Sequence, residues 1–288
     1  MKYILDTDIG SDVDDAMALV QLLGSGEDLI GVTTAYGPTE LRARIAKHYL
    51  ALMSAKVPVF AGERNPMSGK EVWLSGREGK TLPDLGEIQF EDSTAIDFLS
   101  ETLRESNERV TIFCIAPLTN IGTLLEREPS IASKIKQLVI MGGNFTAMTP
   151  EHNFSSDSEA ASIVMDSGID MTLVGLDATR QLRLLDTQVE QIANAGGAGQ
   201  TLATEILDWW DYWGTTWGVP HDSMAISAAF RPELFDLSDL GSVEIEKGGE
   251  RDGVSKFTPG KGTARFVKTF DQDAVSRDIL EGIVRGCK

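Results

Sequence analysis

Five carboxylates stand within ten residues near the start of the chain, directly after a short apolar run: Asp6, Asp8, Asp12, Asp14 and Asp15. Carboxylates packed this closely repel one another, so they either spread into solvent or are held together by a cation. Asp14 and Asp15 open an apolar helical pattern, where the helix dipole favours negative charge. That explanation covers two of the five acids and leaves the other three to be explained.

Three kinds of acidic site could use this stretch. A calcium loop of the EF-hand type fails, because its sixth position would be Ser11 rather than Gly and its twelfth Met17 rather than Glu. A phosphatase of the haloacid-dehalogenase type uses a strand followed by Asp-x-Asp, which residues 6–8 match. Gly10 replaces the hydroxyl residue expected next, however, and such a site has no use for a second acidic pair. The third interpretation is a hard-cation site in which one carboxylate activates water.

The elements around the acidic stretch predict an α/β protein. Residues 3–5 are typical of a buried strand and residues 14–23 of an amphipathic helix, so the acids lie at the carboxyl end of a strand, where open α/β sheets bind ligands. No repeat or linker interrupts the chain, so we predict one domain over residues 1–288. Alternating strands and helices indicate a mostly parallel central sheet flanked by helices. The further expected elements are strands at 29–35, 57–62, 110–115, 135–140 and 171–176, a small C-terminal β ribbon over 243–267 and a closing helix over 274–284.

Two segments stand out for their tryptophans. Residues 63–91 are rich in Gly, Pro and charge, and so long a loop usually forms a lid or wall of a site. Trp73 lies in this loop and either stacks on a ligand or plugs the loop onto the core. Residues 202–217 are expected to form a helix with an aromatic stripe, which is more often core or interface than ligand wall. Its members share one helical face: Ile206, Trp209, Trp210, Trp213 and Trp217.

Two further polar stretches could contact a ligand. The loop over 144–157 holds Asn144, Glu151, His152 and Asn153, and such amides and carboxylates pair well with the hydroxyl groups of a polyhydroxylated ligand. Ordinary turn chemistry is the alternative explanation. Later in the chain, a His-Asp pair at 221–222 opens an apolar helix.

Composition narrows the function classes. The formal net charge of −18 argues against a nucleic-acid polymer as partner, although it leaves room for a single nucleoside. No apolar stretch approaches the roughly 18 residues of a membrane span. The two cysteines, Cys114 and Cys287, provide no disulfide framework, and the start of the chain has no signal-peptide layout. We therefore expect a soluble cytoplasmic protein. We also expect a homo-oligomer, either a dimer or a tetramer, since an exposed aromatic stripe at 206–217 would favour self-association.

The order of these motifs resembles that of nucleoside hydrolases of the inosine–uridine-preferring type. The resemblance spans roughly residues 3–230 and rests on the acidic stretch and on four later segments. It implies a mostly parallel α/β sheet, a calcium ion bound at the strand ends, and hydrolysis of the N-glycosidic bond of a ribonucleoside to free base and ribose. The four later segments are Ala-Pro-Leu-Thr-Asn at 116–120, Met-Gly-Gly at 141–143, the run from Asn153 through Asp157 to Ala161, and the His-Asp pair at 221–222.

The resemblance also implies a role for individual residues around the calcium ion. Asp8, Asp15 and Asp222 resemble the carboxylate ligands of the calcium. Ile115 occupies a place where the family offers a backbone carbonyl as a further ligand. Asp14 resembles the base that takes a proton from the attacking water.

Around the substrate, the resemblance implies three ribose-hydroxyl ligands, which are Asn144, Glu151 and Asn153. His221 resembles the group that protonates or polarises the leaving base. Trp73 or a tryptophan from residues 209–217 could stack on a purine base, since an aromatic ring offers it a flat apolar face.

Three departures from the family pattern concern the substrate more than the reaction. Asp12 and Val13 add two residues before the Asp14-Asp15 pair, so Asp12 is a second candidate for the base or metal role. Pro38 replaces an Asn common in the turn after the second strand, and the loop around Trp73 lacks a histidine often found in pyrimidine-accepting members. A diverged, non-catalytic relative that binds ribose or a nucleoside is the alternative function.

Overall fold

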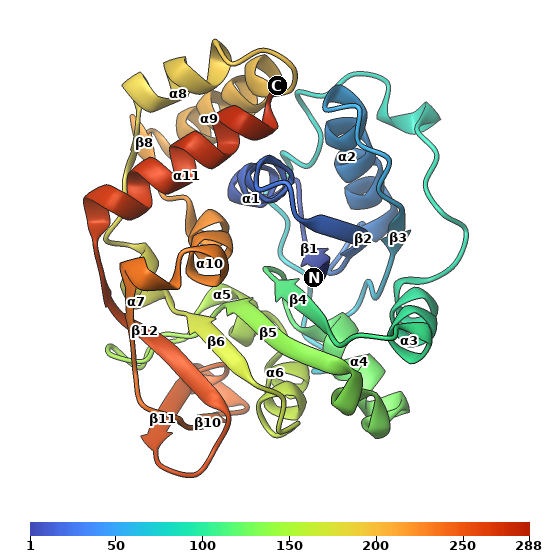
Figure 1. Cartoon of the computed structure of the whole chain (residues 1–288), viewed down its shortest axis with the longest axis vertical. Helices are drawn as coiled ribbons and strands as arrows, with labels where there is room; N and C mark the ends of the chain where they lie inside the picture. The colour runs from blue at the N-terminus through green and yellow to red at the C-terminus, as the bar shows by residue number, and fades with distance from the viewer.

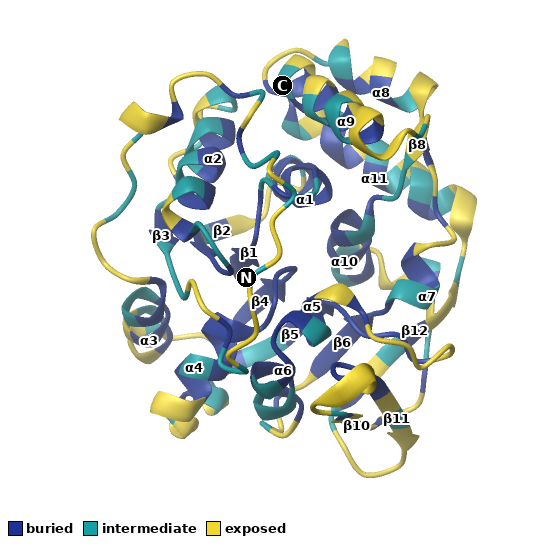
Figure 2. Cartoon of the chain, turned by 180° about the vertical axis from the view of Figure 1, so that it is seen from behind, coloured by how far each residue is buried: buried dark blue, intermediate teal, exposed yellow.

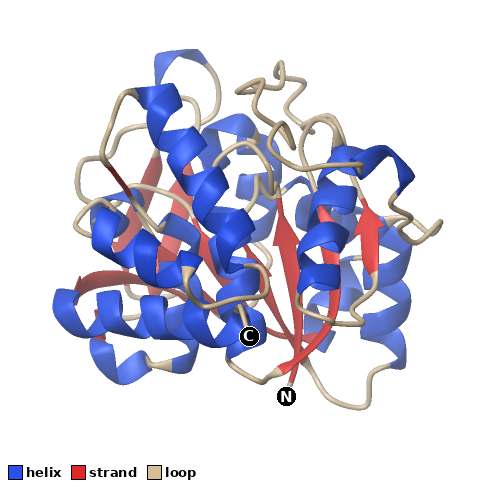
Figure 3. Ribbon diagram, turned by 90° about the horizontal axis from the view of Figure 1, so that it is seen from above, coloured by secondary structure: helices blue, strands red, loops and turns tan.

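A ten-stranded sheet forms the centre of the computed structural model, which describes all residues from 1 to 288. Its strand order is β3-β2-β1-β4-β5-β6-β12-β10-β11, and β9 pairs with β12. Strands β1 to β6 and β12 are mutually parallel, while β9, β10 and β11 pair antiparallel. Figure 3 shows the sheet with helices packed around it. The strands are β1 (Lys2–Thr7), β2 (Asp28–Thr34), β3 (Val59–Ala61), β4 (Val110–Cys114), β5 (Ile135–Met141), β6 (Met171–Val174), β9 (Phe235–Leu237), β10 (Gly241–Ile245), β11 (Ser255–Pro259) and β12 (Ala264–Phe270), and a separate pair joins β7 (Leu184–Leu185) to β8 (Trp217–Gly218).

The strand order reverses between β1 and β4. From β1 the chain builds outward through β2 and β3, then returns to the other side of β1 and continues through β4, β5 and β6. A crevice opens at such a reversal, and ligands of open α/β sheets bind there beyond the carboxyl ends of the strands. The acidic stretch follows β1 and therefore lies at this point, as the sequence predicts.

Helices cover both faces of the sheet (Figure 1). α1, α2, α10 and α11 lie on one face, and α3, α4 and α6 lie on the other. None of them combines the length and the apolar character that a bilayer crossing would require. The helices are α1 (Asp14–Gly24), α2 (Thr39–Leu52), α3 (Ala95–Glu105), α4 (Thr119–Arg127), α5 (His152–Ser156), α6 (Ser158–Met165), α7 (Leu176–Thr179), α8 (Asp186–Ala193), α9 (Gly199–Trp213), α10 (His221–Phe230) and α11 (Gln272–Gly286).

The core is divided by the sheet into two apolar clusters. Alternate residues of a strand point to opposite faces, so Tyr3 and Leu5 of β1 join one cluster and Ile4 joins the other. The larger cluster holds 46 buried residues and the smaller 27, and both lie under helices. Figure 2 shows the central strands buried and the outer turns exposed. Because both faces of β1 are buried, the strand fixes the start of the acidic loop firmly.

The tryptophan stripe differs from its prediction. α9 ends at Trp213, because Gly214 adopts a left-handed conformation with φ of 65° and caps the helix. Trp217 lies beyond this cap in β8, so the expected continuous helix to residue 217 is wrong. Within α9, Ile206 and Trp210 are buried in the larger core cluster.

The C-terminal ribbon forms, but as an extension of the sheet. β10 and β11 make an antiparallel hairpin, while β12 pairs in parallel with β6. In the strand pairing, one residue pair, Gly241 with Ala264, connects the hairpin to β12. The last helix, α11, then returns across the sheet and packs against α1.

Candidate active site

A cavity of about 530 Å³ opens at the reversal of strand order. Its lining comes from loops after β1, β4 and β5, from the long loop over 63–91, and from α9 and α10. Ten residues singled out from the sequence line it together: Asp8, Asp12, Asp14, Asp15, Trp73, Ile115, Glu151, Asn153, His221 and Asp222.

Asp6 has a different position from the other acids of the stretch. Its side chain is fully buried within the sheet and accepts hydrogen bonds from Thr33 Oγ1 at 2.6 Å and Asn120 Nδ2 at 2.6 Å. Burial raises the pKa of Asp6 to about 7. These contacts join β1 to β2 and α4, so Asp6 ties the strand ends together beneath the cavity.

The loop after β1 is held onto the start of α1. Asp15 Oδ1 accepts hydrogen bonds from Thr7 Oγ1 and, at 3.1 Å, from the backbone N–H of Asp8. Gly10 has φ of 114°, and a Cβ there would lie 2.6 Å from Ile45 Cδ1. The positive φ therefore favours glycine at this position, where the loop passes close to α2.

Asp14, Asp15 and Asp222 form a buried acidic cluster. One carboxylate oxygen from each lies within 4.8 Å of the others. Burial, followed by repulsion from neighbouring carboxylates, raises the pKa of all three well above the usual aspartate range. Three buried carboxylate oxygens that converge on one point suit a hard cation, because a cation removes both the repulsion between the carboxylates and the cost of burying their charge. The cluster could therefore hold a metal ion.

Asp8 and Asp12 flank this cluster. Asp8 is buried, and its carboxylate lies 4.0 Å from the guanidinium of Arg42. Asp12 accepts a hydrogen bond from the backbone N–H of Val13 at 2.6 Å, and burial raises its pKa to about 6. Neither belongs to the closest three-oxygen set, so the structure groups Asp14 rather than Asp8 with Asp15 and Asp222.

Glu151 is fixed by the backbone at the start of α5. It accepts hydrogen bonds from the N–H groups of Gly143, Asn153 and Phe154 at 2.9, 2.8 and 3.1 Å. Its Oε1 takes only the bond from Asn153 and keeps a lone pair for a hydroxyl group.

Asn153 uses both amide hydrogens within the fold. Its Nδ2 donates to the carbonyl of Ile115 at 3.2 Å and to that of Met141 at 3.1 Å. The side-chain oxygen of Asn153 and the second lone pair of the Ile115 carbonyl remain available for a ligand. Asn144 does not line the cavity; its amide donates to Thr149 Oγ1 at 2.9 Å within its own loop.

His221 stands beside the acidic cluster at the start of α10. Its Nδ1 lies 2.6 Å from Thr179 Oγ1, and burial, followed by the charges of Arg180 and Arg183, lowers the pKa of the imidazole to about 4. The ring is therefore neutral at pH 7, and Nε2 acts either as donor or as acceptor depending on the tautomer.

Aromatic rings form the outer wall of the cavity. Trp73 is 44% exposed and meets His152 edge to face at 5.8 Å, and Trp209 and Trp213 of α9 line the other side. Trp209 and Trp213 thus face the cavity, Ile206 and Trp210 belong to the core, and Trp217 lies exposed in β8. His152 and Arg180 also line the cavity without having been assigned a role from sequence. The position of His152, between Glu151 and Asn153, was the available signal.

The arrangement is that of a doubly wound α/β protein with an acidic cavity at its strand reversal. The chain matches the Inosine-uridine preferring nucleoside hydrolase family over residues 3–277. It is 34% identical over 280 residues to the pyrimidine-specific ribonucleoside hydrolase RihA of Escherichia coli K12, covering 90% of this chain and 87% of that protein. It is 32% identical over 269 residues to uridine nucleosidase 1 of Arabidopsis thaliana, covering 86% and 79%.

A solved structure agrees with these relatives. The purine-preferring ribonucleoside hydrolase from Gardnerella vaginalis superimposes with a TM-score of 0.87 at 25% identity, covering 100% of this chain and 99% of that one. The chain belongs to the inosine-uridine preferring nucleoside hydrolase family. It is accordingly a hydrolase that acts on the N-glycosyl bond of ribonucleosides, and the family and fold class expected from the sequence are confirmed.

Proposed function

We propose that the protein hydrolyses the N-glycosidic bond of a ribonucleoside in a calcium-dependent reaction, giving free base and ribose. The observation that carries the proposal is the convergence of Asp14, Asp15 and Asp222 at a buried point of the cavity. Carboxylates and a backbone carbonyl are the oxygen ligands that calcium takes in proteins. We assign Asp8, Asp15, Asp222 and the carbonyl of Ile115 to hold it. A calcium ion bound there would orient the water and the ribose hydroxyls and make the water more acidic.

Asp14 is our candidate for the base that removes a proton from the attacking water. Its carboxylate lines the cavity and converges with those of Asp15 and Asp222, so it lies next to a water bound at that point. Asp12 is the alternative, because it also lines the cavity. All these negative charges favour a transition state in which positive charge develops on the ribose.

Glu151 and Asn153 are proposed to bind the ribose hydroxyls. The free lone pair of Glu151 Oε1 and the side-chain oxygen of Asn153 both accept hydrogen bonds, and backbone contacts hold each side chain in place. Asn144 remains a third candidate, although it would have to turn away from Thr149 to reach the ligand.

His221 is proposed to act on the leaving base as a neutral hydrogen-bond donor. With a pKa of about 4, the imidazole carries no extra proton at pH 7. If Thr179 donates to Nδ1, then Nε2 carries the hydrogen that a departing base nitrogen or oxygen needs. Trp73 offers a ring face to the same base.

A nucleoside panel tests the proposal. Purified protein with calcium should release free base from at least one of uridine, cytidine, inosine, adenosine and nicotinamide riboside, and Asp14→Ala should abolish release. Uridine comes first, because the relatives at 34% and 32% identity are named for pyrimidine nucleosides, while the Gardnerella enzyme is named for purines. Ribose or nucleoside binding without turnover across the whole panel would favour the alternative, a diverged and non-catalytic relative.

We further propose that the protein acts in the cytoplasm as a dimer or tetramer. Cys114 and Cys287 are both buried and unpaired, in keeping with a reducing compartment. Leu207 and Tyr212 of α9 are exposed and offer an apolar surface for self-association. Light scattering should report more than one chain per particle, and Leu207→Glu should shift the particle toward a single chain. A monomer at all concentrations would contradict the oligomer.

A further inference from the structure

Arg42 is a fully buried cation on the first turn of α2. Its exposed fraction is 0%, and it is among the largest side chains buried to this degree. A buried guanidinium is strongly destabilising unless its charge and its five N–H donors find partners. The position also departs from the helical pattern, since Arg42 shares the buried face of α2 with Ile45, Ala46 and Tyr49.

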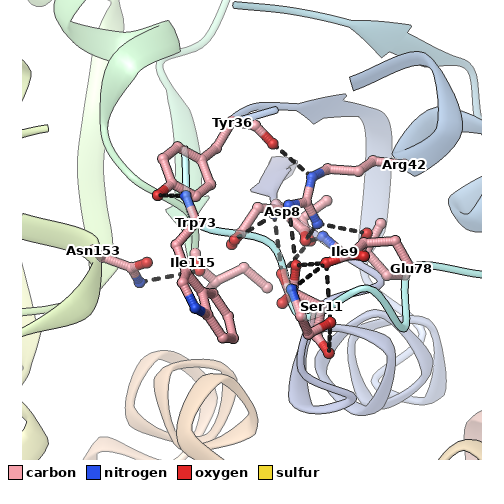
Figure 4. Close-up of polar contacts among 12 residues, drawn as sticks. Asp8, Ile9, Ser11, Tyr36, Arg42, Trp73, Glu78, Ile115 and Asn153 are labelled. Atoms are coloured by element: carbon pink, nitrogen blue, oxygen red, sulfur yellow. Dashed lines mark hydrogen bonds and ion pairs between the residues drawn. The ribbon is translucent and has the colours of Figure 1, made fainter. Parts of the chain in front are cut away.

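The guanidinium of Arg42 donates hydrogen bonds to the acidic loop and to the turn before α2 (Figure 4). Nη1 donates to the carbonyls of Asp8 and, at 3.1 Å, Ile9, and Nη2 donates to Ser11 Oγ at 3.1 Å. Nε donates to the carbonyl of Tyr36 at 2.7 Å. The last donor faces the Asp8 carboxylate, 4.0 Å from Nη2. Each of the five N–H groups therefore faces either a hydrogen-bond acceptor or the Asp8 carboxylate, and four of the five face residues 8–11.

These contacts link three parts of the cavity. Tyr36 has φ of 67°, in the left-handed region that only a few non-glycine residues adopt, and its carbonyl faces Arg42. The Tyr36 hydroxyl accepts the backbone N–H of Trp73 at 2.9 Å. Ser11 Oγ in turn donates to Glu78 at 2.9 Å. Pro38, in the same turn, has no side-chain donor, so the contact to the acidic loop comes from Arg42 one helical turn later.

We propose that Arg42 is the positioning residue of the acidic loop, fixing the backbone of Asp8 and Ile9 so that the Asp8 carboxylate is held beside the cluster of Asp14, Asp15 and Asp222. The inference rests on the proposed calcium-dependent function, because it concerns the loop that would hold the ion. Arg42 touches neither the cluster nor the ribose ligands Glu151 and Asn153, and so acts through Asp8.

The geometry requires arginine rather than a positive charge alone. A lysine ammonium offers three donors from one point, whereas the planar fork reaches the two carbonyls, the hydroxyl and Tyr36 at once. Arg42→Lys should therefore keep the charge and lose part of the positioning, and Arg42→Met should lose both. Arg44→Met is the matched control, since Arg44 lies on the same helix and donates to the carbonyl of Gly86.

The experiment measures calcium affinity by titration calorimetry and kcat and KM at saturating calcium for the nucleoside that the panel identifies. Loss of an outer-shell partner typically weakens metal binding or activity between about tenfold and 100-fold. We expect a loss in that range for Arg42→Met in calcium affinity and kcat, with a smaller change in KM, and an intermediate loss for Arg42→Lys. Arg44→Met should match wild type in all three quantities.

A folded Arg42→Met with wild-type calcium affinity and kcat overturns the proposal, even if its melting temperature is lower, because only stability would then depend on Arg42. If Arg42→Met does not fold, Arg42→Lys carries the same test. Ser11→Ala leaves Arg42 in place and removes one acceptor, so it should give a smaller loss in calcium affinity. Unchanged affinity in Ser11→Ala together with two unfolded Arg42 variants also overturns the proposal.

Calcium affinity separates this proposal from the proposed function. Wild-type protein that binds calcium but releases no base contradicts the hydrolase reaction, while the calcium affinities of the Arg42 variants still decide the positioning role. Wild-type protein that binds no calcium contradicts both.

Discussion

At the scale of single residues, the six aspartates in and beneath one cavity have different surroundings. Asp6 lies beneath the cavity and accepts hydrogen bonds from Thr33 and Asn120, whereas Asp14, Asp15 and Asp222 line the cavity and converge on one point. Identical side chains therefore divide into one that stabilises the strand ends and several that are available for chemistry. Substitution by asparagine, which keeps the shape and removes the charge, can assign each of them.

Asp14→Asn should lower kcat by about 10²-fold to 10⁴-fold, the usual contribution of a general base. Asp12→Asn should lower kcat by less than about tenfold, because Asp14, the proposed general base, is still present and still accelerates the reaction. Asp8→Asn should chiefly weaken calcium binding, which calorimetry measures separately from turnover. If Asp12→Asn instead causes the larger loss in kcat at saturating calcium, the general base is Asp12 rather than Asp14. The two-residue insertion of Asp12 and Val13 would then have changed which aspartate is the base.

His221→Gln tests the leaving-base role by comparing two leaving groups. A nucleoside base departs as an unstable anion unless a donor meets it, so kcat for nucleosides should fall by about 10²-fold or more. A 4-nitrophenyl riboside, whose leaving group is stable as an anion, should lose much less. Equal losses for both substrates would show that His221 positions the ribose or the metal ligands instead.

At the scale of elements, α9 is attached to α2 and to the long loop by one carboxylate. Glu205 accepts hydrogen bonds from the Tyr49 hydroxyl and from Thr81 Oγ1 at 3.1 Å. The ion pair of Arg77 with Asp208, 3.4 Å apart, reinforces the same junction. The walls that carry Trp73 and Trp209 are thus connected outside the cavity.

Burial raises the pKa of Glu205 above its ordinary value, so the folded state holds this proton more tightly than the unfolded state. The free energy of unfolding must then fall as pH rises from the ordinary glutamate pKa through the raised one. Glu205→Gln lacks this proton, so its melting temperature relative to wild type should increase across that window and then level off. Glu190→Gln, at an exposed position of α8, should show no such trend, and a constant difference for Glu205→Gln would contradict the prediction.

Helices and strands were predictable where a regular pattern of apolar residues ends at a residue that commonly starts or stops such an element. The strand 2–7 and the helix beginning at Asp14 follow directly from the apolar run and the acidic pair, and the site residues of their loops do come together. The helix with the tryptophans was overextended because its aromatic period continues past Gly214, whose left-handed conformation ends it. Arg42 was missed because its partners are mainly backbone carbonyls, which leave no trace in sequence apart from a charge on an apolar face.

At the scale of the whole molecule, the two ends of the chain pack together. α1 lies so close to α11 that a Cβ at Gly24 would meet the carbonyl of Gly282 at 2.1 Å, and Arg285 Nε donates to the carbonyl of Gly24 at 3.2 Å. The larger core cluster runs from Tyr3 to Cys287. These contacts support our proposal that residues 1–288 form one domain.

One domain should unfold in one cooperative step whose midpoint depends on calcium. The proposed ligands Asp8 and Asp15 lie near the start of the chain and Asp222 more than 200 residues later, so an unfolded chain cannot present the same site. Calcium at 100 times its dissociation constant should add about 2.7 kcal/mol to the free energy of unfolding, and a chelator should remove it. Calorimetry should give a single transition in both conditions, with equal calorimetric and van't Hoff enthalpies. Asp222→Asn should lose the calcium-dependent shift, whereas Asp239→Asn, an exposed change of the same charge, should keep it; a shift retained in Asp222→Asn would place the ion elsewhere.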